Sequence, residues 1–487
     1  MGEFYGRMHE LAGLAALTKK STASLVAVTG RRRNGKSRLI EEFARRSRGY
    51  RFLALSALAP EPDVTEAMQR DAIASSLERT LKIPPIAHAN WSDVLAHIAY
   101  NTKKGRWIVL LDEVSWMAQR DPAFLGRLKT AWDQLFKQND QLILVLCSSV
   151  SSWIEKNLLS STGFVGRVSW SLRLEQLPLE HSALFPGLRS ATHSAYDILK
   201  MLAVTGGVPK YLEELLGEMT AEQNIRRLCF QPEGLLFNEF DHIFHTLFEG
   251  RSDLYRRIVT ALVATRLDLG GVCDALGNQK SGVISSYLDD LVMAGFLAKD
   301  PSWELRTGKT KRQHLYRIRD NYLRFFLRYV DPRRSEIEEK RFGEKPLETL
   351  RGWDSMLGLQ FENLVLQNRR FVWSQCGLTP GEVAQDGPFF QTPTTRRSGC
   401  QVDYLIQTTQ GPIFLCEIKF HRGEVRPKVI ADVQEKLHKL VKPRHTSIFP
   451  VLIHVGGVSP KTLESGFFSH VIDFREALGG AGGARRP

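Results

Sequence analysis

Cysteine is scarce in this chain, and long hydrophobic runs are absent from it. Six cysteines occur among the 487 residues, and no two of them have the C-x-x-C spacing of a zinc or redox site. We therefore expect reduced thiols in a cytoplasmic protein without disulfides. No apolar segment approaches the roughly 20 residues that cross a bilayer, which excludes a membrane-spanning class. Glu3, Arg7 and Glu10 interrupt the N-terminus, so we expect no signal peptide.

Acidic residues are outnumbered by basic ones. Arginine and lysine total 66 against 53 aspartates and glutamates, a formal net charge of +13. This excess favours a polyanionic partner, and we expect nucleic acid, with DNA as the first choice. The chain is also too long for one hydrophobic core, which predicts about two to four domains.

A phosphate-binding loop is the clearest motif. Residues Gly30–Ser37 follow an apolar run and match the pattern G-x-x-x-x-G-K-[ST]. Gly30 and Gly35 let the backbone turn so that its N–H groups surround a phosphate. Lys36 can then reach the β- and γ-phosphates, and the Ser37 hydroxyl can ligate Mg²⁺. The remaining predicted nucleotide-binding residues of this segment are Arg31, Arg32, Arg33, Asn34 and Arg38.

Four apolar, β-rich segments separated by helical stretches predict a parallel sheet covered on both faces. They are Leu25–Val28, Arg51–Leu55, Trp107–Leu111 and Leu142–Leu146. Asp112 and Glu113 close the third segment, as in a Walker B motif. We expect Asp112 to hold the Mg²⁺ shell and Glu113 to polarise the attacking water. No N-K-x-D motif is present to read guanine, so ATP is the expected nucleotide.

Two further features of this half have open interpretations. Ser148 and Ser149 follow the fourth segment, where one of them can contact the γ-phosphate, or both can belong to an ordinary turn. Arg167 is either an arginine finger that stabilises the transferred phosphate or a surface residue in an ion pair.

Several short motifs together resemble the archaeal-type ATPases, a P-loop family related to the AAA+ and STAND ATPases. They are Phe4–Arg7, Gly30–Ser37, Leu111–Glu113, Trp132–Asp133 and Gly207–Leu212. The resemblance implies that Gly6 and Arg7 lie near the adenine and that Pro209 belongs to a helical lid that contacts the nucleotide. The family commonly has Gly-Ser where this chain has Ser148-Ser149, so the resemblance does not decide which serine senses the phosphate.

Residues 250–332 have the pattern of a winged helix-turn-helix, three helical segments followed by a hairpin. The hairpin carries basic residues that suit a phosphate-binding wing: Arg306, Lys309, Lys311 and Arg312. The candidate recognition helix has small and acidic residues instead, among them Ser281, Asp289 and Asp290. DNA contact and a structural role both remain open for this segment.

Two expected strands near the C-terminus, residues 401–406 and 413–420, bring acidic residues together. Asp403 lies on the first, and Glu417 and Lys419 share one face of the second because side chains alternate along a strand. Two paired carboxylates can hold Mg²⁺, and Lys419 can orient the attacking water or stabilise developing charge. The alternative is a structural ion pair of Glu417 with Lys419 or Arg422.

This C-terminal pattern resembles the PD-(D/E)xK nuclease fold, in a domain of the DUF234 type that archaeal-type ATPases often carry. The resemblance implies a further metal ligand or supporting contact from Glu362 and a helper residue at Gln434. A degenerate fold that binds without cutting remains the alternative.

The predicted fold class is α/β, a P-loop sheet with a helical lid, a winged helix and a C-terminal α/β restriction-endonuclease-like domain. The predicted divisions are 1–185 for the ATPase core, 186–249 for the lid, 250–332 for the winged helix, 333–350 for a linker, 351–475 for the nuclease-like domain and 476–487 for a flexible tail.

The expected function is ATP hydrolysis coupled to Mg²⁺-dependent nuclease action on nucleic acid, in repair, mobile-element control or defence. The expected cofactors are ATP and Mg²⁺, and a homo-oligomer or a partner protein is a further possibility. One alternative is a STAND-like regulatory ATPase whose C-terminal domain is a non-cleaving binding module. Another is a nucleotide-driven assembly scaffold.

Overall fold

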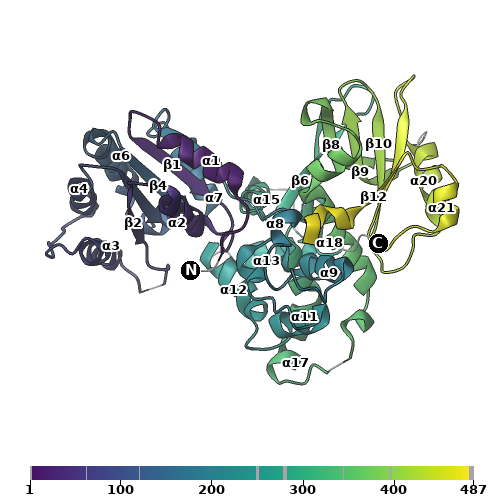
Figure 1. Ribbon diagram of the computed structural model, residues 1–487, viewed down its shortest axis with the longest axis horizontal. Coiled ribbons are helices and arrows are strands. Elements are labelled where there is room, and N and C mark those ends of the chain that lie inside the picture. Colours follow the sequence, from purple (N-terminus) through teal and green to yellow (C-terminus); the bar gives the residue numbers. More distant parts are fainter. Residues whose placement is uncertain are drawn as a thin grey trace. The chain divides into compact units, whose positions relative to one another are not determined.

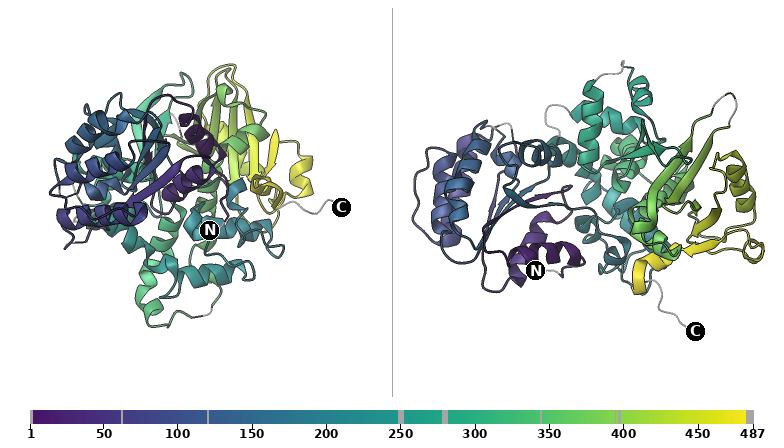
Figure 2. Two further views of the ribbon diagram at one scale, coloured as in Figure 1. Left: turned by 60° about the vertical axis from the view of Figure 1, so that its left-hand side comes forward. Right: turned by 90° about the horizontal axis from the view of Figure 1, so that it is seen from above.

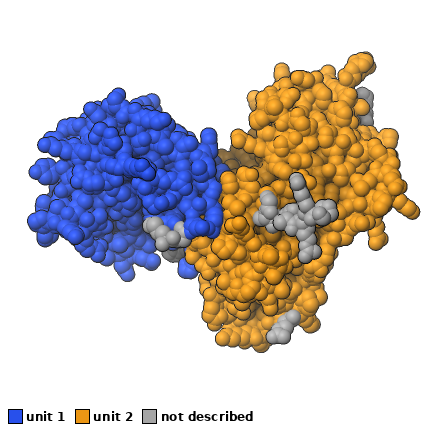
Figure 3. Space-filling view, viewed as in Figure 1, with its two compact units in different colours: residues 1–176, 242–252, 293–295 blue, residues 177–241, 253–292, 296–487 orange. Residues whose placement is uncertain are grey.

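The computed structural model describes residues 3–481 except 62, 120, 248–251, 278–281, 344, 394, 396 and 397. The chain divides into two compact units, coloured separately in Figure 3. The first comprises residues 1–176, 242–252 and 293–295, and the second comprises residues 177–241, 253–292 and 296–487. The finer division into core, lid, winged helix and C-terminal domain stays a prediction.

A five-stranded parallel sheet organises the first unit, in the order β2-β3-β4-β1-β5. Its strands are β1 (Ser24–Thr29), β2 (Arg51–Ser56), β3 (Trp107–Asp112), β4 (Leu142–Ser148) and β5 (Val168–Arg173). The four predicted strands are confirmed. The sequence pattern missed β5, because apolar and polar residues alternate in Val168–Arg173 and form no continuous apolar run.

Helices cover both faces of this sheet (Figure 1). Side chains of α1 and α2 pack with Val26 and Val28 of β1, whereas side chains of α3, α4 and α6 pack with Leu25 and Ala27. Successive residues of a strand point to opposite faces, which explains this division. The helices are α1 (Met8–Leu17), α2 (Lys36–Arg46), α3 (Glu66–Leu81), α4 (Trp91–Asn101), α5 (Val114–Met117), α6 (Phe124–Gln134) and α7 (Ser151–Ile154).

Helices dominate residues 177–293, and a hairpin follows them. The helices are α8 (Leu179–Ser182), α9 (Ala195–Thr205), α10 (Pro209–Leu212), α11 (Ala221–Cys229), α12 (Leu235–Leu247), α13 (Ser252–Ala261), α14 (Leu269–Ala275) and α15 (Gly282–Met293). The antiparallel hairpin pairs β6 (Leu297–Trp303) with β7 (Thr310–Ile318). Three helices and a hairpin therefore occur in the predicted order, while the winged-helix identity stays a prediction.

The hairpin also packs on the C-terminal sheet. The Trp303 indole donates a hydrogen bond to the Gln407 side chain at 3.1 Å, and its ring meets Phe389 edge-on. In the candidate recognition helix, Asp290 accepts from the Tyr255 hydroxyl and Asp289 pairs with Lys299. Ser281 lies outside the described residues. Through these contacts of Trp303, the hairpin has a structural role in packing against the C-terminal sheet.

A second five-stranded sheet, green to yellow in Figure 2, organises the C-terminal part in the order β12-β11-β10-β9-β8. Strands β8 to β10 form an antiparallel meander, and β11 and β12 run parallel to β10. Both predicted strands are confirmed as β9 and β10. The strands are β8 (Val383–Gln391), β9 (Cys400–Thr408), β10 (Ile413–Lys419), β11 (Ile448–His454) and β12 (His470–Asp473).

Helices flank the meander and connect it to the rest of the second unit. Helix α18 precedes the meander and α20 joins β10 to β11. The helices of this part are α16 (Asn321–Phe325), α17 (Arg334–Glu338), α18 (Trp353–Gln367), α19 (Arg369–Gln375), α20 (Lys428–Lys439) and α21 (Pro460–Glu464).

Two segments expected to be loose are more ordered than the sequence suggests. In the expected linker, the side chains of Ile337 and Leu347 are buried. In the expected tail, Phe474–Ala481 form helical turns interrupted by a non-helical backbone at Gly479, and Ala477 and Leu478 are buried. Apolar residues three and four apart reach one face of a helix, so the segment can bury them together. The burial of Ala477 and Leu478 differs from the expectation of a flexible tail from residue 476, and the division at that residue stays a prediction.

Candidate active sites

The phosphate-binding loop lies between the end of β1 at Thr29 and the start of α2 at Lys36. Gly30 and Gly35 have φ angles of 144° and 84°, which side chains rarely tolerate. A Cβ atom on Gly30 would also lie 2.5 Å from the Leu174 carbonyl oxygen. The loop therefore needs glycine at position 30 for two independent reasons. In the same segment Arg31 and Asn34 are buried, and Arg32, Arg33 and Arg38 are half-buried.

We expect Gly30→Ala to lower the free energy of unfolding by roughly 2–4 kcal/mol, since backbone strain adds to a steric clash. The matched control is Gly126→Ala in helix α6, where a Cβ atom would meet nothing within 4 Å. That substitution should leave stability unchanged or raise it slightly. Urea denaturation followed by circular dichroism measures both variants. Equal stability of the two would contradict the argument.

Lys36 and Ser37 lie where the motif predicts. The Lys36 ammonium is buried and donates to the Gly30 carbonyl oxygen at 3.0 Å. The Ser37 hydroxyl donates to Asp112 at 2.6 Å, which joins the loop to the end of β3. A hydroxyl and a carboxylate are the hard oxygen donors that Mg²⁺ prefers, so this pair fits the expected ion.

Glu113 is held by the end of strand β4. Its carboxylate accepts hydrogen bonds from both the backbone N–H and the hydroxyl of Ser149, each at 2.8 Å. Ser148 instead contacts the Ser115 hydroxyl at 2.8 Å. Of the two serines left open by the sequence, Ser149 is thus the one in contact with the predicted catalytic carboxylate.

Arg7 braces the phosphate-binding loop. Its buried guanidinium donates to the carbonyl oxygens of Asn34 at 3.4 Å and Glu175 at 2.5 Å, and it pairs with Glu10 at 3.1 Å. Burial lowers the pKa of Arg7, and Glu10 partly offsets this effect. Gly6 precedes it in a left-handed conformation, with φ 69°. The described contacts make Arg7 a positioning residue for the loop, and its expected proximity to adenine stays a prediction.

Arg167 and Pro209 are the two remaining candidates for nucleotide chemistry. Arg167 forms a bidentate ion pair with Asp133, with nitrogen–oxygen distances of 2.9 Å, and this pair holds the pKa of Asp133 below its usual range. Of the two roles considered for Arg167, the structure contains the ion pair. Pro209 begins helix α10 in the second unit.

The C-terminal candidates meet at the centre of the mixed sheet. Asp403 of β9 accepts from the Ile418 backbone N–H at 3.2 Å, and Glu417 of β10 is almost completely buried. The Lys419 ammonium donates to Glu417 at 2.7 Å. Asp403, Glu417 and Lys419 are therefore brought together as predicted, with the ion pair that was the alternative interpretation also present.

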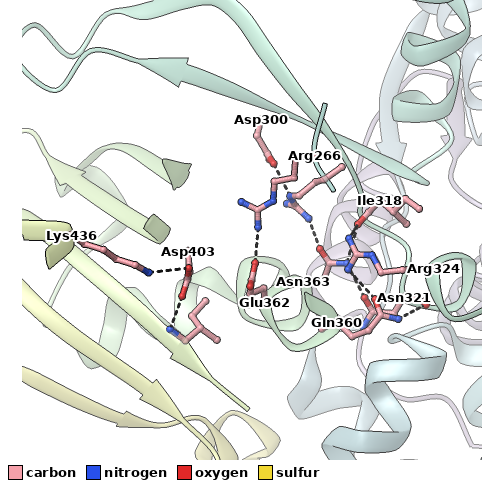
Figure 4. Close-up of polar contacts among 12 residues, drawn as sticks. Arg266, Asp300, Ile318, Asn321, Arg324, Gln360, Glu362, Asn363, Asp403 and Lys436 are labelled. Atoms are coloured by element: carbon pink, nitrogen blue, oxygen red, sulfur yellow. Dashed lines mark hydrogen bonds and ion pairs between the residues drawn. The ribbon is translucent and has the colours of Figure 1, made fainter. Parts of the chain in front are cut away.

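Lys436 is the residue that the sequence analysis missed. This lysine of α20 donates to Asp403 at 3.4 Å, as Figure 4 shows. It also donates to Glu417 at 2.6 Å, so one ammonium joins both carboxylates. The expected helper Gln434 is exposed. Lys436 lies three residues after the buried Val433, on the apolar face of α20, and this position was the available signal.

The electrostatics of this cluster are balanced by charge pairs. Burial raises the pKa of Asp403, and the nearby Glu417 raises it further. Burial lowers the pKa of Lys436, but Asp403 and Glu417 outweigh that effect and leave it raised. The two carboxylates are thus compensated by Lys419 and Lys436.

Glu362 of α18 pairs with Arg266, whose guanidinium donates to it at 2.6 Å (Figure 4). Within the described residues, Glu362, Asp403 and Glu417 do not bring carboxylate oxygens within 4.8 Å of one another as a set of three. In this arrangement Glu362 therefore does not form one group of metal ligands with Asp403 and Glu417. Burial raises the pKa of Glu362 to about 7, with Asp403 adding to the effect and Arg266 opposing it.

We expect Arg266→Gln to destabilise the protein by roughly 2–4 kcal/mol near pH 8 and by much less near pH 5. Because the pKa of Glu362 is raised in the folded protein, this carboxyl favours folding below its ordinary value of 4.5, and the contribution is lost as the pH rises through about 7. Without Arg266 the ionised Glu362 carboxylate is buried without this ion-pair partner, so the substitution destabilises the protein more at high pH than at low pH.

Thermal unfolding of Arg266→Gln at both pH values, in metal-free buffer, measures this contrast. Glu362→Gln is the control, because it removes the titrating group and should abolish the pH dependence that this group contributes. An equal destabilisation of Arg266→Gln at both pH values would overturn the assignment.

A basic cavity of about 530 Å³ opens beside Lys419. Cationic and titratable side chains in its lining include His421, Arg426 and Lys428, with Glu424 and Asp432 as the acidic members. Lys419 itself lines this cavity, which therefore reaches the Lys419 side of the cluster. Within the part of the chain that the structure describes, no helix is both long and apolar enough to cross a membrane.

A comparison with protein families supports the nucleotide site around the phosphate-binding loop. Residues 4–215 match the family described as "ATPase domain predominantly from Archaea". An uncharacterized protein of Methanocaldococcus jannaschii, MJECL04, is 25% identical over 363 residues, which cover 74% of this chain and 76% of that protein.

Two solved structures are similar at low sequence identity. The Walker-type ATPase PABY2304 of Pyrococcus abyssi has a TM-score of 0.48 and 17% identity, and covers 67% of this chain and 96% of its own. The ORC2 protein of Aeropyrum pernix has a TM-score of 0.44 and 13% identity, and covers 70% of this chain and 96% of its own. Residues 4–215 therefore combine a match to this ATPase family with a parallel sheet and with the glycine conformations expected of a phosphate-binding loop.

Proposed function

We propose that this protein hydrolyses ATP and that its C-terminal domain is a Mg²⁺-dependent nuclease. The proposal of a nuclease rests on one observation. Asp403 and Glu417 lie on neighbouring strands, and both accept a hydrogen bond from the Lys436 ammonium. Charged groups on strands this apolar are costly unless they are paired or bind metal. Two carboxylates and two lysines beside a basic cavity suit phosphodiester chemistry.

In the ATPase half, Lys36 would move from the Gly30 carbonyl oxygen to the phosphates and balance their charge. Ser37 and Asp112 would hold Mg²⁺, which supplies charge neutralisation at the β- and γ-phosphates. Glu113 would orient the attacking water after exchanging its Ser149 hydrogen bonds for that water. Ser149, released from Glu113, would then be free to contact the γ-phosphate and report on its state.

In the C-terminal half, Asp403 and Glu417 would be the metal ligands, and Mg²⁺ bound there would activate a water for attack on phosphorus. Lys419 would stabilise the negative charge that develops on the phosphate oxygens. Lys436 would have to leave the space between the two carboxylates, since its ammonium now compensates both of them.

The proposed substrate is nucleic acid, with DNA as the first choice. The formal charge of +13 and the cavity lined by His421, Arg426 and Lys428 support a polyanionic ligand. Assembly into a homo-oligomer or with a partner protein is a further proposal, and so are the remaining nucleotide roles of Gly6, Arg167 and Pro209.

A regulatory ATPase with a non-cleaving C-terminal module is the second candidate. The position of Lys436 favours it, because an ammonium that joins Asp403 and Glu417 stands in for a bound cation. Such a site would bind a phosphate backbone through Lys419 and the cavity without hydrolysing it.

The deciding experiment incubates the full chain with labelled single- and double-stranded DNA and RNA, with Mg²⁺ or EDTA, and with or without ATP. Cleavage that requires Mg²⁺ supports the nuclease. Nucleic-acid binding without cleavage under every condition favours the regulatory candidate. ATP turnover is followed in the same samples, so that the two halves of the proposal are scored separately.

A further inference from the structure

Three potential metal ligands meet in the first unit, outside both sites described above. Glu78 lies in α3, His97 lies in α4, and His88 lies in the loop between these helices. One ligand atom from each of the three side chains lies within 4.8 Å of the other two, and all three residues are half-buried. No role in nucleotide or nucleic-acid chemistry has been assigned to them.

The two imidazoles are already close to the separation that a shared ion requires. His88 Nε2 and His97 Nδ1 are 3.0 Å apart, and the rings stack with centroids 5.1 Å apart. Zinc–nitrogen bonds of about 2.0–2.1 Å at a tetrahedral centre place two such nitrogens about 3.3 Å apart. An ion replacing the proton between the rings would therefore need only a small adjustment of either side chain.

The surrounding contacts hold the ligands in place. One Glu78 carboxylate oxygen accepts from the Ile86 backbone N–H at 2.9 Å. On the other side of His88, Asp93 accepts from the backbone N–H groups of Ala89 at 3.0 Å and Asn90 at 3.2 Å. The loop that carries His88 is thus anchored to α3 and to the first turn of α4.

We propose that Glu78, His88 and His97 bind a divalent transition-metal ion, with Zn²⁺ as the first choice. Two imidazoles and one carboxylate are a zinc-type donor set with a fourth position for water, whereas Mg²⁺ prefers oxygen ligands throughout. The ion would link α3 to α4, and α3 itself packs against α5, the helix that directly follows Glu113. It would brace the helical layer beside the Walker B strand.

The test uses the full chain, freed of metal with EDTA, dialysed and kept in excess Mg²⁺. Co²⁺ is titrated while visible absorption is recorded, and Zn²⁺ binding is measured by calorimetry. We expect one tight equivalent in the wild type, tetrahedral Co²⁺ absorption, and a Zn²⁺-dependent rise in the thermal midpoint. His88→Ala should weaken this equivalent at least tenfold and abolish the rise in midpoint.

The matched control is His438→Ala, which removes an exposed histidine of α20 and should bind as the wild type does. Glu78→Gln gives a second variant if His88→Ala is unstable without metal. Equal stoichiometry and affinity in the wild type and in the site variants would mean adventitious binding at other histidines. No tight equivalent in the wild type would mean that His88 and His97 form only a hydrogen bond. Either result overturns the proposal.

Discussion

Lys36→Ala is expected to lower ATP turnover at least 100-fold and to weaken nucleotide binding. The Lys36 ammonium is buried beside the Gly30 carbonyl oxygen, and Lys36 is the motif residue expected to reach the β- and γ-phosphates. Loss of a single preorganised charge or donor commonly costs about 10²–10³ in rate. Phosphate release and binding of a fluorescent ATP analogue, both with Mg²⁺, measure the two effects.

Two further variants test whether this effect is specific to Lys36. Lys103→Ala removes an exposed lysine of the same unit and should leave turnover unchanged. Glu113→Gln should bind ATP normally but hydrolyse it slowly, because it loses the carboxylate that orients water while the loop stays intact. Wild-type turnover in Lys36→Ala would contradict the assigned role of this lysine in ATP hydrolysis.

Glu417→Gln is expected to abolish Mg²⁺-dependent cleavage, with a loss of at least about 100-fold. The glutamine keeps the shape of the buried side chain but lacks the charge that a metal ion needs. Lys436→Met should act in the opposite direction on metal affinity, since it removes the cation that now joins Asp403 and Glu417. Half-maximal cleavage should therefore require less Mg²⁺ in Lys436→Met than in the wild type.

The matched control for both variants is Glu435→Ala, which removes an exposed carboxylate one residue before Lys436. It should cleave as the wild type does. Cleavage that survives Glu417→Gln would place the nuclease outside this cluster. Cleavage by Lys36→Ala at the wild-type rate, with and without ATP, would show that the nucleotide does not control the C-terminal domain.

Local patterns were enough to predict the parts of this protein whose chemistry lies within a few consecutive residues. The loop Gly30–Ser37 and the pair Asp112–Glu113 each consist of consecutive residues, so their motifs can be read from the sequence. The alternation along a strand was likewise enough to place Glu417 and Lys419 on one face, with Asp403 on the neighbouring strand.

The tertiary structure alone decided which charged side chains meet. Arg167 pairs with Asp133, Glu113 contacts Ser149, and Lys436 joins the acidic cluster, although each partner lies on a different element. Arg266 reaches Glu362 from a distant part of the chain, and His88 meets His97 only because α3 and α4 pack together. A lone arginine, lysine or histidine fits many surfaces equally well, so its local sequence does not specify a partner. Packing of the buried apolar faces selects that partner, because it brings distant elements within the few ångströms over which hydrogen bonds form.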